Sequence, residues 1–218
     1  MDSLPVSHAH RTIFVHIPKT AGTSVEAALG MHGLKTDVGV RPYFNQALDR
    51  EHLYGRDAQH LTAEGLKSEL NGLFDSYFKF TVVRNPWDRL VSTCAWSDQK
   101  WFKGEELVGS EFERVVRQLY AASRDPKTAQ TLLKSTHFKP QFLYIVDREL
   151  HPMVDHVARY ENLAADWAHI RTRLNLGADL PGRMKSHHRP YQEYYSDETR
   201  AMVGEMYSRD VSMFGYAF

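Results

Sequence analysis

Several features that would point to other protein classes are missing from this chain. It has one cysteine, Cys94, in 218 residues, which excludes an internal disulfide framework. Cys94 lies in an apolar helical run, and this setting favours a buried structural thiol over a nucleophile. Lysine plus arginine equals aspartate plus glutamate, at 27 each. The overall charge therefore gives no support for a nucleic-acid-binding protein.

No stretch is long and apolar enough to span a bilayer, and the opening residues, MDSLPVSHAHRT, lack the apolar core of a signal peptide. We therefore expect a cytoplasmic protein. Internal repeats, low-complexity tracts and domain linkers are also missing. A chain of 218 residues can bury one full α/β core, so we expect residues 1–218 to form a single domain.

Metal-ligand patterns are missing as well, although the chain contains 12 histidines. The pairs His8/His10 and His187/His188 have no third ligand at a recognisable spacing. There is no HExxH motif and no Cys/His set. The sequence therefore predicts no metal site.

The most informative stretch is Thr12–Gly30, which reads TIFVHIPKTAGTSVEAALG. Its β-branched and aromatic start predicts a buried strand, which Pro18 ends. From Gly22 onward, Val25 and the alanine and leucine that follow fall on one helical face. The stretch therefore predicts a strand, a tight turn and a helix.

The turn itself has the composition of an anion site. The first amides of a helix lack internal partners, and the helix dipole adds positive charge there. Glycine allows close approach of the backbone, the hydroxyls add donors and the lysine adds a full charge. We predict a phosphate or sulfate site made by Lys19, Thr20, Ala21, Gly22, Thr23 and Ser24. A Thr or Ser N-cap is the alternative, but it explains only one hydroxyl. The turn is not a Walker A loop, because the lysine precedes the glycine.

A second strand is predicted at Tyr77–Val83, followed by Arg84-Asn85 and by Pro86, which suits the first position of a helix. Arginine suits a terminal phosphate because its planar fork donates two hydrogen bonds. Ser92 lies further along this helix, near the face that carries Asp88. The alternative for Arg84 is a surface ion pair with Asp88 at i,i+4 spacing.

Alternation of strands and helices continues along the chain and predicts an α/β fold with a short parallel sheet and helices on both faces. The expected segments are an irregular loop at Met31–Gly55, a helix capped by Thr62 that runs to about Leu70, an amphipathic helix within Lys100–Arg124, a loop at Arg124–Pro140, a strand at Phe142–Val146, a strand at Met153–Tyr160, a helix at Leu163–Leu174 and a helix at Asp197–Ser208 capped by Ser196.

Two motifs resemble a known family. HIPKTAGTS (His16–Ser24) is similar to the 5′-phosphosulfate loop of sulfotransferases that use 3′-phosphoadenosine 5′-phosphosulfate (PAPS), and is closest to carbohydrate sulfotransferases and their bacterial relatives. FTVVRNPWDRLVS (Phe80–Ser92) resembles the family's 3′-phosphate site. Two motifs in the right order are more specific than either alone. Weaker similarity, through Arg159–Leu163 and the closing segment, covers most of the chain.

The resemblance implies a three-layer fold like that of P-loop nucleotide kinases. It also implies PAPS as co-substrate, the desulfated nucleotide PAP as product, and a hydroxylated acceptor, which we expect to be a carbohydrate in a glycan or glycolipid. Animal relatives in the Golgi carry a membrane anchor. Since no anchor is found here, we expect a cytoplasmic bacterial enzyme or an excised catalytic domain.

The resemblance also assigns binding residues. Arg84 and Ser92 match residues that hold the 3′-phosphate. The late basic loop LPGRMKSHHR, which closes over the donor in the family, offers Lys185 and Arg189. A solvated run of charge is the alternative there. His137 and Gln141, in an H-x-x-P-Q segment, match residues beside the acceptor pocket.

The expected reaction is an in-line attack of an acceptor oxygen on the sulfuryl group. Lys19 would stabilise charge on the leaving phosphate, and Ser92 would influence Lys19 as a serine does in relatives. His60 is the expected base, since the usual histidine pKa of about 6.5 is close to neutrality. A capping or surface histidine is the alternative for His60. His137 is the reserve base, and His16 is expected to be structural.

Two other functions are compatible with an anion-binding turn. A small Mg²⁺-dependent nucleotide kinase would ordinarily need a Walker lysine. A non-catalytic nucleotide- or glycan-binding module would retain the turn without the base. Loss of turnover in a Lys19 variant would separate an enzyme from a binding module.

Overall fold

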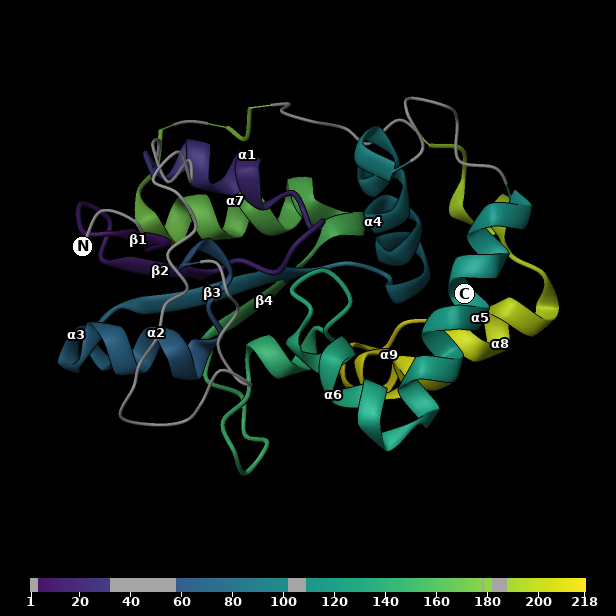
Figure 1. The fold of residues 1–218 in the computed structure, drawn as a ribbon. Coiled ribbons are helices and arrows are strands. Elements are labelled where there is room, and N and C mark those ends of the chain that lie inside the picture. The colour runs from purple at the N-terminus through teal and green to yellow at the C-terminus, as the bar shows by residue number, and fades with distance from the viewer. Residues whose placement is uncertain (1–3, 32–57, 102–108, 178, 182–187) are drawn as a thin grey trace. The chain divides into compact units, whose positions relative to one another are not determined.

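The structure is a computed structural model that describes residues 4–31, 58–101, 109–177, 179–181 and 188–218 (Figure 1). The chain divides into two compact units. The first, here called the sheet unit, combines Met1–Val83 with Gln141–Met184. The second, the helical unit, combines Arg84–Pro140 with Lys185–Phe218. The expected loop at Met31–Gly55 lies, beyond Met31, outside the described residues.

The sheet unit contains a four-stranded sheet in the order β1-β2-β3-β4. The strands are β1 (Val6–Ser7), β2 (Thr12–Val15), β3 (Phe78–Val83) and β4 (His156–Arg159). β2, β3 and β4 are parallel, whereas β1 pairs with β2 in the antiparallel sense. The predicted parallel sheet is thus confirmed for three strands. The short edge strand makes the sheet mixed.

Helices cover both faces of this sheet, as expected. Figure 1 shows α1 (Gly22–Ala28) and α7 (Leu163–Leu174) on one face, and α2 (Ala63–Leu70) and α3 (Gly72–Ser76) on the other. Alternate strand residues face α1 and α7 and form a buried apolar cluster with them. This cluster contains Phe14, Val25, Leu29, Met31, Phe80, Val82, Ala158, Trp167 and Ile170.

The helical unit is built from α4 (Pro86–Trp101), α5 (Gly109–Arg124), α6 (Pro126–Lys134), α8 (Asp197–Met206) and α9 (Ser208–Phe214). Its core cluster contains Trp87, Leu90, Val91, Cys94, Phe112, Val116, Tyr194, Val203 and Tyr207. Cys94 is buried, as predicted for a structural thiol. Ser196 caps α8 through a reciprocal capping box with Thr199.

Two sequence-based expectations were wrong. The segment Arg124–Pro140, expected to be a loop, contains α6. This helix has Asp125 as its N-cap, which accepts from the backbone nitrogen of Lys127 at 3.0 Å, and a proline in its first turn. The expected strand at Phe142–Val146 is instead a 3₁₀ turn, η2 (Phe142–Tyr144). Tyr144, Ile145 and Val146 are buried, and a short apolar run does not distinguish a strand from a buried turn.

Three further 3₁₀ turns connect the elements: η1 (Ala58–His60), η3 (Tyr160–Asn162) and η4 (Tyr191–Tyr194). η1 leads into α2, which Thr62 caps by accepting from the Gly65 nitrogen at 3.2 Å, as predicted. Among the helices in the described residues, none is long and apolar enough to cross a membrane.

Candidate active site

The turn after β2 has an unusual backbone. Lys19 and Ala21 both have φ of 70°, in the left-handed region, while Thr20 between them has negative φ. Alternation of this kind forms a concave nest of backbone N–H groups that suits an anion. Left-handed conformations of residues other than glycine cost roughly 1–3 kcal/mol and are concentrated at functional sites. The backbone conformation of the turn therefore indicates a functional role in addition to reversing the chain.

The side chains of this turn divide into different roles. The N-cap of α1 is Ala21, and no side chain caps the helix, so the Thr or Ser N-cap interpretation is excluded. The buried Thr20 hydroxyl donates to the Ile17 carbonyl at 2.8 Å, a hydrogen bond within the turn. Thr23 is exposed, Ser24 is buried and Lys19 is half-buried.

Gly22 is required by a neighbour within the protein. A Cβ atom at this position would lie 1.9 Å from Nε2 of His16, far inside any contact distance. The sequence analysis assigned Gly22 to the close approach of an anion. The structure adds a steric reason, because the His16 ring occupies the space that a side chain would need.

His16 belongs to a buried polar network. Its Nδ1 lies 2.7 Å from Oε1 of Glu26, and the amide of Gln59 donates to the other Glu26 oxygen, also at 2.7 Å. His60 Nδ1 lies 2.9 Å from the backbone oxygen of His16. The two imidazole rings meet edge to face, with centroids 4.4 Å apart.

This network places the predicted base next to the anion-binding turn, since the His16 ring touches both His60 and Gly22. His60 is only 9% exposed, and Thr62 is the residue that caps the following helix. A surface or capping role for His60 is therefore excluded. Sequence analysis identified both histidines but missed Glu26 and Gln59.

The residue that follows β3 is also buried. Arg84 is 4% exposed, and its Nε donates to Oδ2 of Asp88 at 2.6 Å. The i,i+4 ion pair considered from the sequence thus exists, but it is buried rather than on the surface. Asp88 and the buried Ser92 are four residues apart in α4 and share one face.

In the late basic loop, His188 lies near Arg84, although the sequence analysis assigned it no role in the donor site. His188 Nε2 lies 3.5 Å from a terminal nitrogen of Arg84 and 4.0 Å from Oδ1 of Asp88. The half-exposed Arg189 pairs with Glu193 at 3.4 Å and lies over the ring of Tyr194. Lys185 lies outside the described residues. The signal for His188 was its place in the basic run, but its partner is 104 residues away.

A family model described as "Sulfotransferase family" matches residues 2–217. The chain belongs to the sulfotransferase family. Neither a curated protein nor a solved structure matches the chain. Membership of this family makes the chain an enzyme of sulfuryl transfer with a hydroxyl acceptor, and sulfotransferases generally take the sulfuryl group from PAPS.

The segment of this sulfotransferase predicted to contact the acceptor is fixed by Arg89. This buried arginine donates to the backbone oxygens of Lys139 at 3.0 Å and His137 at 3.2 Å. The His137 ring stacks on Trp96, with centroids 4.7 Å apart. Gln141, in the sheet unit, is fully buried.

Lys139 is a further residue to which the sequence analysis assigned no role. It is 2% exposed, and burial lowers the pKa of its ammonium group from 10.5 to about 8. A lysine with a lowered pKa is a recognised mark of a functional region. Its sequence neighbours Phe138 and Pro140 gave no sign of this burial.

The lowered pKa of Lys139 predicts a pH-dependent stability. Between pH 8 and 10.5 the unfolded sulfotransferase holds a proton that the folded form has lost, so stability should rise with pH across this window. Lys139→Met should remove that slope and raise stability at pH 7 by up to about 3 kcal/mol. Thermal unfolding at several pH values measures both. The exposed Lys127→Met is the control, and equal slopes in the two variants would contradict the prediction.

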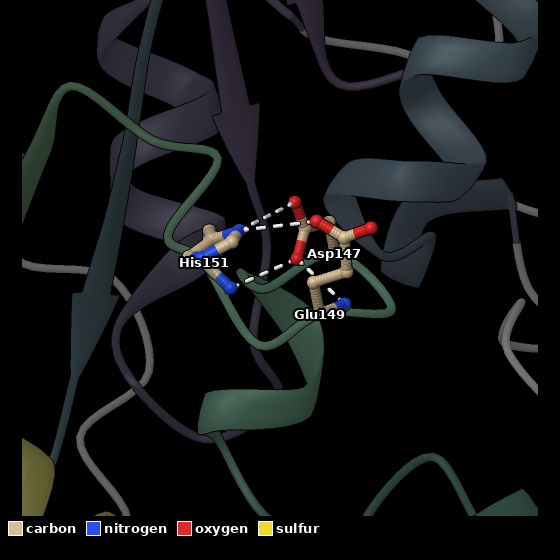
Figure 2. A group of neighbouring side chains, drawn as sticks. All are labelled: Asp147, Glu149 and His151. Atoms are coloured by element: carbon tan, nitrogen blue, oxygen red, sulfur yellow. Dashed lines mark hydrogen bonds and ion pairs between the residues drawn. The ribbon is translucent and has the colours of Figure 1, made fainter.

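Figure 2 shows a group in the sulfotransferase that a metal could use in principle, formed by Asp147, Glu149 and His151. Their ligand atoms lie within 4.8 Å of one another, and Glu149 and His151 are exposed. Asp147 Oδ1 accepts from the backbone nitrogens of His151 at 2.8 Å and Glu149 at 2.9 Å. These hydrogen bonds lower the pKa of Asp147 and shape the loop. We assign the group this structural role, and the absence of a metal cofactor stays a prediction.

Proposed function

We propose that this sulfotransferase transfers the sulfuryl group of PAPS to a hydroxyl of a carbohydrate, in a glycan or glycolipid. The observation that carries the proposal is the Lys19–Ala21 turn, whose φ values alternate in sign and which is followed by Gly22, packed against the His16 ring of a buried histidine pair. The carbohydrate assignment is supported by the resemblance of His16–Ser24 to carbohydrate sulfotransferases.

In the proposed reaction the acceptor oxygen forms a bond to sulfur while the bond from sulfur to the 5′-phosphate oxygen breaks. The electron pair of the broken bond stays on that phosphate, where the Lys19 ammonium stabilises the charge. The acceptor proton moves to His60. Backbone N–H groups from Ala21 to Thr23 hold the phosphosulfate, whereas the Ser24 N–H donates to the Ala21 carbonyl at 3.0 Å, so that Ser24 would contribute through its hydroxyl. The resemblance alone suggests that Ser92 influences Lys19.

The hydrogen bond of His60 supports its role as base. A backbone carbonyl can only accept, so the contact between His60 Nδ1 and the His16 oxygen requires the proton on Nδ1. In the neutral ring the lone pair is then on Nε2. His60 Nε2 is therefore the proposed proton acceptor.

The 3′-phosphate end of the donor is proposed to bind Arg84 and Ser92, with Lys185 and Arg189 contributing from the late loop. We add His188, because it contacts Arg84 in the helical unit. The Asp88 carboxylate fixes the guanidinium by binding its Nε, which orients the planar fork toward a ligand. His137 and Gln141 are the proposed acceptor contacts.

Calorimetric titration with PAP tests the donor site, with ATP and AMP as comparison ligands and with or without Mg²⁺. We expect metal-independent binding that needs the 3′-phosphate. Arg84→Ala should weaken it roughly 10- to 100-fold, the usual effect of losing hydrogen bonds to a charged group. Arg114→Ala, which removes an exposed arginine paired with Glu111, should bind like wild type.

A preference for ATP with Mg²⁺ would overturn the proposal in favour of a nucleotide kinase. Once PAP binding is established, incubation with PAPS and either neutral glycans or simple phenols tests the acceptor class. Sulfated glycan detected by mass supports the carbohydrate assignment, and sulfated phenol alone would contradict it.

A further inference from the structure

We propose that Glu26 is a positioning residue for the base, and that it acts through His16 to fix which nitrogen of His60 receives the acceptor proton. Gln59 in turn holds Glu26. The inference rests on the proposed function, specifically on His60 as the base. It adds two residues, Glu26 and Gln59, for which the sequence motifs gave no role.

The first link is the orientation of His16. An ionised carboxylate only accepts hydrogen bonds, so His16 Nδ1 donates to Glu26 Oε1 at 2.7 Å. The Gln59 amide donates to Glu26 Oε2, also at 2.7 Å. Both carboxylate oxygens are engaged, and the glutamate is 6% exposed. The His16 ring is therefore held in one rotamer, with its Nε2 edge against Gly22.

The second link runs from His16 to the base. The backbone oxygen of His16 accepts from His60 Nδ1 at 2.9 Å, and the His16 ring packs edge to face on the His60 ring. One residue thus supplies both the hydrogen-bond acceptor and the packing surface of the base. If the His16 ring moved, the His60 ring would lose this packing and could rotate away from the backbone oxygen. The hydrogen bond that fixes the proton on Nδ1 would then be lost, and the two neutral tautomers could exchange.

The third link is the connection between sequence-distant elements. Glu26 lies in α1, Gln59 and His60 are neighbours in η1, and His16 follows β2. Glu26 and Gln59 therefore tie the anion-binding turn and the segment carrying the base into one hydrogen-bonded unit. A carboxylate that orients a catalytic histidine through hydrogen bonding is a recurrent arrangement in enzymes. Here the carboxylate of Glu26 contacts His16, and His16 in turn contacts the proposed base His60.

Glu26→Gln is the informative substitution, because it preserves shape but replaces one of the two acceptor oxygens by an NH₂ donor, which then faces the donor of either His16 or Gln59. We expect kcat for sulfuryl transfer to fall about 10- to 100-fold, in the range of general-base contributions, with PAP affinity unchanged. ¹⁵N chemical shifts of the His60 ring should show a single Nδ1–H tautomer in wild type and a mixture in the variant. Glu149→Gln, an exposed substitution in the sheet unit, is the control and should change neither.

Thermal unfolding and PAP titration verify that Glu26→Gln is folded. If it is not, Gln59→Leu provides the second variant, with the same tautomer change and a smaller loss of kcat. An unchanged tautomer with unchanged kcat in the folded variant would overturn the positioning role. His60→Ala separates the two proposals: full activity in that variant would remove His60 as base, and with it the proposed mechanism.

Discussion

Lys19→Ala is expected to lower kcat for sulfuryl transfer by at least about 100-fold, the usual effect of removing one stabiliser of transition-state charge. The lysine is half-buried and lies in the turn with left-handed φ values that is proposed to bind the phosphosulfate. Alanine in place of lysine also has a Cβ atom, so the backbone strain of the turn should change little. The measurement is the initial rate with saturating PAPS, together with thermal unfolding.

The control for this variant is Lys67→Ala. Lys67 is an exposed lysine of α2 that pairs with Asp75 at 3.2 Å, and an exposed ion pair contributes little to stability. Its removal should leave both turnover and unfolding unchanged. Near-normal turnover in Lys19→Ala would eliminate the proposed role of the lysine in stabilising the leaving phosphate.

Gly22→Ala is the second substitution with a large expected effect. The new Cβ would lie 1.9 Å from His16 Nε2, so the His16 ring must move and lose its hydrogen bond to Glu26. Overpacking of a buried site typically costs about 1–3 kcal/mol. We expect a lower thermal unfolding midpoint and turnover reduced at least about 10-fold, because the base loses its support.

A double substitution tests the cause. In His16→Ala the ring that clashes is gone, so adding Gly22→Ala to that variant should lower the thermal midpoint much less than it does in wild type, while turnover stays low. Gly72→Ala is the control, since a Cβ there meets nothing within 4 Å. An equal drop in the midpoint in both backgrounds would show that the glycine is needed for another reason.

Much of the fold could be predicted because its signals are local. The strand–turn–helix at Thr12–Gly30 combined a β-branched run, a proline and a helical period, and Pro86 marked the start of α4. Thr62 and Ser196 were recognisable as caps from their positions before helical runs. In each case the residues that decide the structure are within a few positions of one another.

The failures have physical causes too. Helix α6 begins with an Asp-Pro cap signal that was overlooked in a polar segment. The run at Phe142–Val146 is apolar because its last three residues are buried, and burial does not require a strand. The network around His16 connects residues 10, 33 and 44 positions apart, and such contacts exist only after folding. Gly22 was correctly singled out, but its contact with the His16 ring could be seen only in three dimensions.

The interleaving of the two units has a consequence for how the gene can be divided. Each unit is assembled from two separate stretches of chain, so truncation at one point of the chain cannot produce either unit by itself and intact. A polypeptide ending at Pro140 would lack β4 and α7, leaving the long strand β3 as an exposed edge with an uncovered apolar face. Unpaired edges of this kind invite aggregation. Truncated forms of this enzyme should therefore be recovered from inclusion bodies, whereas internal deletions in loops offer the better route to smaller versions.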